Sequence, residues 1–105
     1  MDAQESVVGE KRMNLSEARE IIDRINRGML HLFIERMEVS QGIAQYKQTE
    51  GLPVRDEGRE QAILDMMMAE TPDDLKPYTG ALFETLFALS RAYQEQLAGK
   101  DKPIV

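Results

Sequence analysis

The chain has 105 residues, of which 42% are hydrophobic and 30% charged, a composition typical of one small folded domain rather than a disordered segment. It carries 13 basic and 19 acidic residues, and a formal net charge of -6 makes it a poor general nucleic-acid binder, because phosphate contacts need a basic face. It has no cysteine and a single histidine, His31, which excludes disulfide frameworks, zinc–thiolate sites and multi-histidine metal sites, and argues against a Ser-His-Asp triad.

Residues 1–13 come first and show no helical periodicity, so they are expected to form a frayed leader. Residues 1–12 are mainly polar, with Val7 and Val8 as the main exception, and lack the pattern of a secretory signal. No apolar run approaches the ~18 residues of a membrane span. The sequence therefore predicts a cytoplasmic protein.

A long helix is predicted over residues 14–50. Asn14 with Glu17 three residues later has the form of a capping box, and Gly51 with Pro53 is a stop signal. Such a helix measures roughly 54 Å at 1.5 Å per residue, whereas a compact chain of this length has a radius of gyration near ~13 Å. Because the rest of the chain is too short to cover it, we expect a second copy to pack along it.

Apolar residues on this helix alternate in steps of three and four, the pattern of a heptad seam. They are Ile22, Ile25, Met29, Leu32, Val39, Ile43 and Tyr46. The position between Leu32 and Val39 is Arg36, and a buried guanidinium without an anionic partner costs several kcal/mol. Lys47 lies three turns later on nearly the same face, roughly 16 Å along the axis. Two such cations fit a small polyanionic ligand, or each reaches solvent or pairs with a glutamate such as Glu35 or Glu50.

Arg19 precedes Arg36 by 17 residues, which rotates it by about 100° around the helix. It is therefore poorly placed to serve the same groove from the same chain. It could serve the groove of a partner chain across a dimer seam, and the alternative is a solvated arginine.

Two shorter helices are expected after the loop 51–54. Asp56 can cap the first of them, which runs to about residue 70. The other runs over about residues 77–98, with Gly99 as its C′ residue. Its buried face is expected to comprise Phe83, Leu86, Phe87, Leu89 and Leu97. No segment has the alternation of a strand, so the predicted fold is all-α, with three helices, a very long first helix and a dimeric state.

Both shorter helices carry groups of polar residues that indicate a ligand-binding site. Asp56, Arg59 and Glu60 share one face of the first, where the alternative is a cap with a local ion pair. Ser90 and Gln94 continue the apolar stripe of the second, which suggests a lined cavity. The alternative is that this helix leaves the core at that point.

In chain order these polar residues resemble the pocket of the AroQ-type chorismate mutases. The local strings Ile34–Met37, Ala44–Lys47 and Pro53–Glu60 carry the resemblance, which extends over about residues 14–97. No residue departs from the family pattern at its eight polar pocket positions, which are Arg19, Arg36, Lys47, Asp56, Arg59, Glu60, Ser90 and Gln94.

The resemblance implies an intertwined, all-helical homodimer with two pockets, each of which takes its Arg19 from the other chain. It implies the Claisen rearrangement of chorismate to prephenate, in aromatic amino-acid biosynthesis, with no cofactor and no metal. The mutase domain is expected to span residues 14–98, between the leader and a tail over residues 99–105. No further domain or secretory signal is apparent, so we expect a stand-alone, cytoplasmic enzyme.

Four residues are implied to bind the substrate carboxylates. Arg36 and the other chain's Arg19 hold them, since guanidinium groups match carboxylates in geometry. Arg59 braces the carboxylates, and Ser90 helps to bind one of them. Together they would select the compact, reactive conformer.

The other four positions are implied to contact the ether oxygen and the hydroxyl group. Lys47 and Gln94 donate to the ether oxygen, which gains negative charge in the transition state. Glu60, supported by Asp56, receives the substrate hydroxyl. Because Gln94 is an amide where some members of the family have glutamate, we expect no acid requirement.

Three alternatives remain at this point. Isochorismate-pyruvate lyases share the fold and the cationic pocket, although those known to us do not keep the run of Asp56, Arg59 and Glu60 intact. The chain could instead be a weakly active module that docks onto a shikimate-pathway synthase. A plain helical interaction protein is the third alternative, and in such a protein the loss of Arg36 would be neutral or stabilising.

Overall fold

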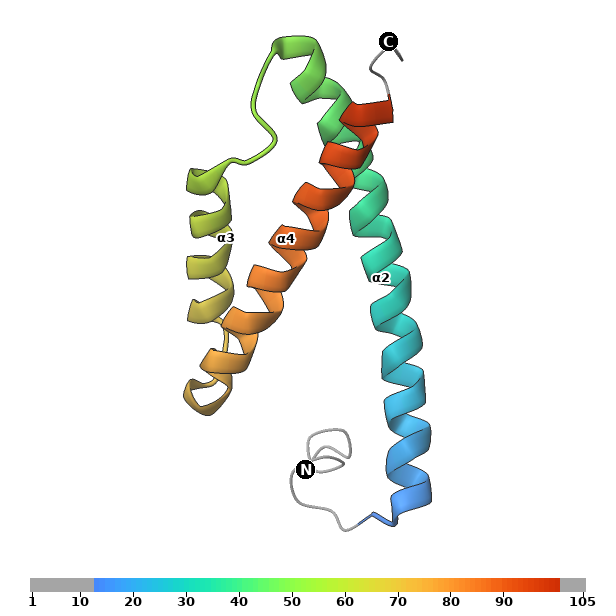
Figure 1. The fold of residues 1–105 in the computed structure, drawn as a ribbon. Coiled ribbons are helices and arrows are strands. Elements are labelled where there is room, and N and C mark those ends of the chain that lie inside the picture. Colours follow the sequence, from blue (N-terminus) through green and yellow to red (C-terminus); the bar gives the residue numbers. More distant parts are fainter. Residues whose placement is uncertain (1–12, 101–105) are drawn as a thin grey trace. The chain divides into compact units, whose positions relative to one another are not determined.

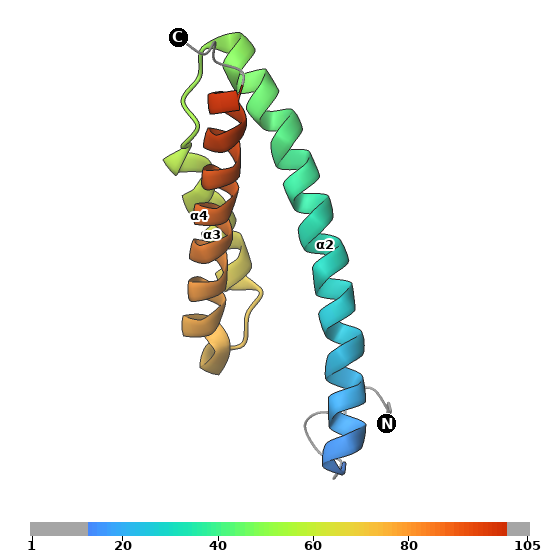
Figure 2. The same cartoon turned by 45° about the vertical axis from the view of Figure 1, so that its right-hand side comes forward.

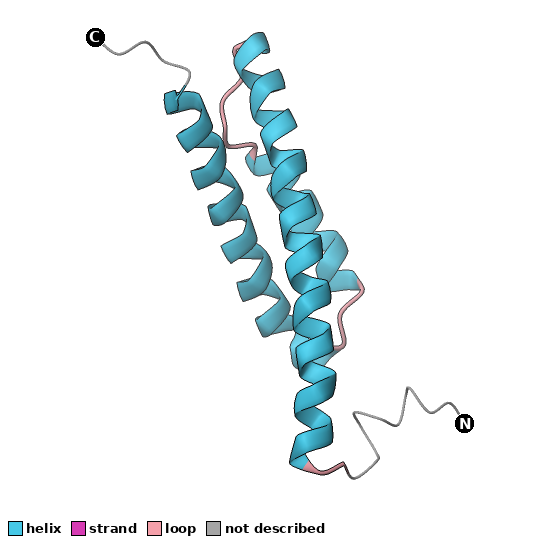
Figure 3. Ribbon diagram, turned by 90° about the vertical axis from the view of Figure 1, so that its right-hand side faces the viewer, coloured by secondary structure: helices cyan, strands magenta, loops and turns pink. Residues whose placement is uncertain are grey.

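A computed structural model describes residues 13–100, which form three α-helices and a short 3-10 helix (Figure 1). In chain order these are α2 (Leu15–Glu50), α3 (Glu57–Ala69), η1 (Asp73–Leu75) and α4 (Lys76–Lys100). No strand occurs among the described residues (Figure 3), and the prediction of an all-α fold with a very long first helix is confirmed. Most of the expected leader and residues 101–105 of the expected tail lie outside the described residues. Within residues 13–100, no helix has the length and apolar character needed to cross a membrane.

The chain divides into two compact units, residues 1–35 and residues 36–105, and α2 is helical on both sides of this boundary. The first unit begins its helix as the sequence predicts. Asn14 Oδ1 accepts a hydrogen bond from the Glu17 backbone amide at 2.8 Å, and Glu17 Oε1 accepts one from the Asn14 amide at 3.3 Å. This reciprocal pair is a capping box, which satisfies two of the amide donors that a helix start leaves open.

In the second unit, α2 ends in a Schellman motif around Gly51. The Gly51 amide donates to the Gln48 carbonyl at 3.3 Å, and the Leu52 amide donates to the Lys47 carbonyl at 2.8 Å. This geometry needs a residue with positive φ, and Gly51 has φ 69°. The motif therefore sets the direction in which the chain leaves α2.

Replacing Gly51 by alanine should lower the free energy of unfolding by about 1 kcal/mol, because a Cβ disfavours positive φ. Gly51→Asn should cost less, since asparagine tolerates the left-handed conformation. Urea denaturation at one fixed protein concentration measures both. Equal losses for alanine and asparagine would contradict the assigned role of the backbone conformation.

Helices α3 and α4 lie side by side in the second unit (Figures 1 and 2). Asp56 caps α3 as predicted, with Oδ1 accepting from the Arg59 amide at 3.0 Å. The expected end of the last helix is wrong: α4 continues through Gly99 to Lys100, and Gly99 does not have positive φ. A glycine inside a helix costs only about 1 kcal/mol relative to alanine, so it need not terminate one.

Few side chains of the described residues are buried. The buried apolar ones are Ala44 and Phe87, and the buried polar ones are Ser40 and Gln94. Leu89, expected on the buried face of α4, is instead 44% exposed. The exposed positions include the whole apolar seam of α2, whose side chains are between 43% and 67% exposed.

Candidate active site

The second unit contains a cavity of about 490 Å³, lined by residues of α2, α3, α4 and the loop before α3. Its size falls in the range of small-molecule sites. Its apolar wall includes Val39 and Ile43 from α2, Ile63 from α3 and Phe87 from α4. A ligand with an apolar ring would therefore find hydrophobic contacts from three helices.

Seven of the eight predicted site residues line this one cavity. They are Arg36, Lys47, Asp56, Arg59, Glu60, Ser90 and Gln94. Arg19, the eighth, belongs to the first unit, where it is exposed on α2. The fold thus brings together residues that are far apart in the sequence, while the role of each stays a prediction.

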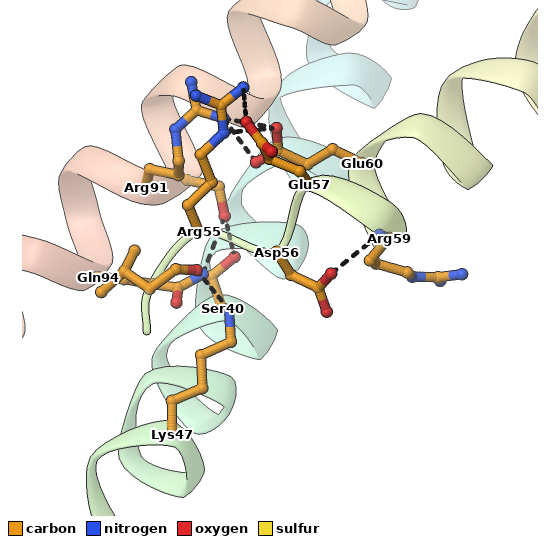
Figure 4. Close-up of polar contacts among 11 residues, drawn as sticks. Ser40, Lys47, Arg55, Asp56, Glu57, Arg59, Glu60, Arg91 and Gln94 are labelled. Atoms are coloured by element: carbon orange, nitrogen blue, oxygen red, sulfur yellow. Dashed lines mark hydrogen bonds and ion pairs between the residues drawn. The ribbon is translucent and has the colours of Figure 1, made fainter. Parts of the chain in front are cut away.

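Two cations on α2 line the cavity, and neither has a carboxylate partner in the part of the chain that the structure describes. Arg36 is half-buried, and within residues 36–100 it forms no ion pair. Lys47 donates from Nζ to the backbone carbonyl of Val54 at 2.5 Å (Figure 4). The alternative in which Glu50 neutralises Lys47 is therefore not the observed arrangement.

The cavity carries more positive than negative charge although the chain is acidic. Its lining contains four cationic and two carboxylate side chains, a formal charge of +2. Local charge of this sign raises the concentration of anionic ligands at a site, whatever the net charge of the chain. The cavity therefore suits a small ligand that carries carboxylates.

Asp56 and Arg59 do not form the local ion pair that was one alternative for this segment. The cap of that alternative is observed, since the Asp56 carboxylate accepts from the backbone amide of Arg59. The Arg59 side chain is exposed and extends away from Glu60 (Figure 4). Its guanidinium group is thus left available to a ligand at the rim of the cavity.

Side-chain hydrogen bonds among Ser40, Ser90 and Gln94 join α2 to α4 at the wall of the cavity. Ser40 Oγ and Ser90 Oγ are 2.7 Å apart, and Gln94 Nε2 lies 3.5 Å from Ser90 Oγ. Gln94 is only 6% exposed, and its Oε1 has no partner among the described residues. A buried polar atom without a partner costs about 1–3 kcal/mol, and such an atom calls for an explanation in a native fold.

Glu60 forms an ion pair with Arg91, a residue of the cavity wall that the sequence analysis did not predict. Arg91 Nη1 donates to Oε1 of Glu60 at 2.6 Å and to Oε2 at 2.5 Å (Figure 4). The only sequence signal was spacing, since Arg91 lies four residues after the buried Phe87 and so continues its stripe on α4. Ser40, also missed, shares this kind of signal, because it lies four residues after Arg36.

The comparison with protein families identifies the chain. Residues 18–95 match the family model described as chorismate mutase type II. The chain belongs to the chorismate mutase type II family. Chorismate mutases are isomerases, and the matched residues of this chain include every residue that lines the cavity. The comparisons with curated proteins and with solved structures gave no match.

The groups that line the cavity suit binding and electrostatic stabilisation. It offers guanidinium, ammonium, amide and hydroxyl donors around an apolar wall. Donors fixed in a partly dry cavity can hold a ligand in one conformation and stabilise charge that develops on it.

Proposed function

We propose that the protein converts chorismate to prephenate by a Claisen rearrangement within the described cavity. In this reaction the ether C–O bond breaks as a C–C bond forms, and every atom stays in the product. The observation that carries the proposal is the cationic cavity of about 490 Å³, lined by seven residues of the expected pocket in a chain of the chorismate mutase family.

Selection of the compact substrate conformer is assigned to the arginines. Arg36 would bind one carboxylate of chorismate, with Ser90 assisting, and Arg59 would brace the carboxylates from the cavity rim. Holding the reacting carbons close together lowers the entropic part of the barrier. The support for this assignment is that neither guanidinium group forms an ion pair within residues 36–100.

Stabilisation of the developing charge is assigned to Lys47 and Gln94. An ammonium group has three donors, and the Val54 carbonyl occupies one of those of Lys47. Rotating the Gln94 amide by about 180° exchanges its oxygen and nitrogen. Oε1 could then accept from Ser90, and Nε2 would be left to donate to the ether oxygen. This role is supported by the buried Oε1, which has no hydrogen-bond partner among the described residues.

Gln94→Glu should make turnover depend on acid. An amide donates at any pH, whereas a carboxyl group donates only when protonated, so the variant should lose kcat/KM as the pH rises. The unaltered enzyme should show a flat profile across the same range. Steady-state kinetics with chorismate between pH 5 and about pH 8 measures both profiles. A rate of the unaltered enzyme that collapses above about pH 6 would contradict donation by the amide.

We further propose that the active protein is a homodimer in which Arg19 completes the pocket of the other chain. The apolar seam of α2 supports this, because side chains such as Leu32, at 67% exposed, and Tyr46, at 63%, are open in the single chain. An apolar stripe of this length is typical of an interface. The cytoplasmic location and a synthase partner stay predictions.

The test of the proposed function is an assay of the purified protein with chorismate and with isochorismate, with the products separated by chromatography. Prephenate from chorismate is the expected result. Pyruvate and salicylate from isochorismate alone would make the protein a lyase and overturn the proposal. Turnover of neither substrate would also contradict it and would direct attention to a synthase partner, sought by co-purification.

A further inference from the structure

The ion pair between Arg91 of α4 and Glu60 of α3 is the shortest of those formed by the described side chains. Both partners are largely withdrawn from solvent, since the side chain of Arg91 is 26% exposed and that of Glu60 is 18% exposed. A second guanidinium, that of Arg55, lies 3.7 Å from Oε1 of Glu60 but is 56% exposed. Arg91 is therefore the dominant partner of this carboxylate.

A carboxylate at this place poses an electrostatic problem. The proposed substrate is a dianion, so an uncompensated Glu60 would repel the ligand that the cavity has to bind. Partial withdrawal from water strengthens that repulsion. Arg91 removes it, because the pair is close to neutral, and it leaves the charges of Arg36, Lys47 and Arg59 for the ligand.

Arg91 compensates the charge of Glu60 and still leaves its carboxylate able to accept further hydrogen bonds. One nitrogen of Arg91, Nη1, contacts both carboxylate oxygens. A carboxylate has about four lone-pair positions, so each oxygen keeps capacity for a further hydrogen bond. Contact at both oxygens also limits rotation of the carboxylate plane. Glu60 is thus held as an acceptor of fixed orientation.

We propose that Arg91 is a positioning residue, which neutralises and orients Glu60 so that this carboxylate can accept the substrate hydroxyl without repelling the substrate. This inference rests on the proposed function. A purely structural alternative is that the pair only joins α3 to α4. If Arg91 is a positioning residue, loss of its positive charge should raise KM. If the pair only joins the helices, loss of that charge should lower Tm and leave KM unchanged.

The experiment compares Arg91→Met, Arg91→Lys and Glu60→Gln with the double variant Arg91→Met/Glu60→Gln, using chorismate as substrate. Arg91→Met should lower kcat/KM by about 10- to 100-fold, mainly through a rise in KM, because Glu60 becomes mobile and keeps only the distant, exposed guanidinium of Arg55 as a partner. Arg91→Lys should restore most of the loss by restoring the charge. In the Glu60→Gln background, Arg91→Met should cost less than about threefold, because no carboxylate remains to be compensated.

Arg55→Met is the matched control, because it removes the more exposed guanidinium from the same carboxylate. We expect a loss several times smaller than that of Arg91→Met. Thermal unfolding of each variant identifies any loss of folded protein. Equal losses from Arg91→Met in both backgrounds, or an unchanged KM with a lowered Tm, would overturn the inference while the proposed function stands. Absence of turnover by the unaltered protein would overturn both.

Discussion

Lys47→Ala should lower kcat/KM for chorismate by about 10²- to 10³-fold, the loss typical when one donor to a developing oxyanion is removed. Most of the loss should be in kcat, because the charge on the ether oxygen exists only in the transition state. Steady-state kinetics measures the effect, and circular dichroism checks that the helices are retained. A loss confined to KM would contradict the assigned role.

Lys76 offers a matched control for this variant. Its Nζ also donates to a backbone carbonyl, that of Thr71 at 2.8 Å, but it does not line the cavity. Lys76→Ala should therefore leave kcat/KM unchanged. A similar loss in both variants would show that removal of a lysine–carbonyl contact, rather than of a charge in the cavity, was responsible.

Mixing two inactive variants extends this test to the proposed dimer. In a heterodimer of Lys47→Ala and Arg19→Ala chains, one pocket has an intact Lys47 and receives an intact Arg19 from the other chain. Random exchange at equal amounts should then restore about a quarter of the unaltered rate. If Arg19 served the pocket of its own chain, no heterodimer would contain an intact site and the mixture would stay inactive.

Arg36→Ala is the second variant with a large expected effect, a loss of about 10²- to 10³-fold in kcat/KM, because two charge-assisted hydrogen bonds to a carboxylate disappear. The free energy of unfolding should be unchanged or higher, since Arg36 is half-buried and forms no ion pair within residues 36–100. Activity is followed with chorismate, and stability by urea denaturation.

Arg36→Lys separates charge from geometry at the same position. Lysine keeps the positive charge but lacks the planar fork that matches a carboxylate, so we expect an intermediate loss of about 10-fold. A helical interaction protein would instead tolerate both changes. Full activity in Arg36→Ala would exclude the proposed carboxylate contact.

Local sequence patterns were enough to predict most of the helix boundaries and the fold class. The capping box at Asn14, the cap at Asp56 and the stop at Gly51 each depend on residues within a few positions of one another, so their hydrogen bonds could be predicted. Composition and spacing also predicted an all-α fold. The one wrong helix end, at Gly99, arose because glycine permits a C-cap without requiring one.

Candidate pocket residues could be selected from the sequence because a cation or an amide on an apolar helical face is conspicuous. Whether they meet depends on how α3 packs against α4 and how α4 meets the second part of α2 through Ser40 and Ser90, which no local pattern encodes. Arg91 illustrates this limit: its partner Glu60 lies 31 residues away, and only tertiary packing brings the two together at hydrogen-bonding distance. The sequence by itself therefore determined the helices and the types of group available, through short-range capping and periodicity. The tertiary structure alone decided which charges are compensated, since that depends on distances between helices.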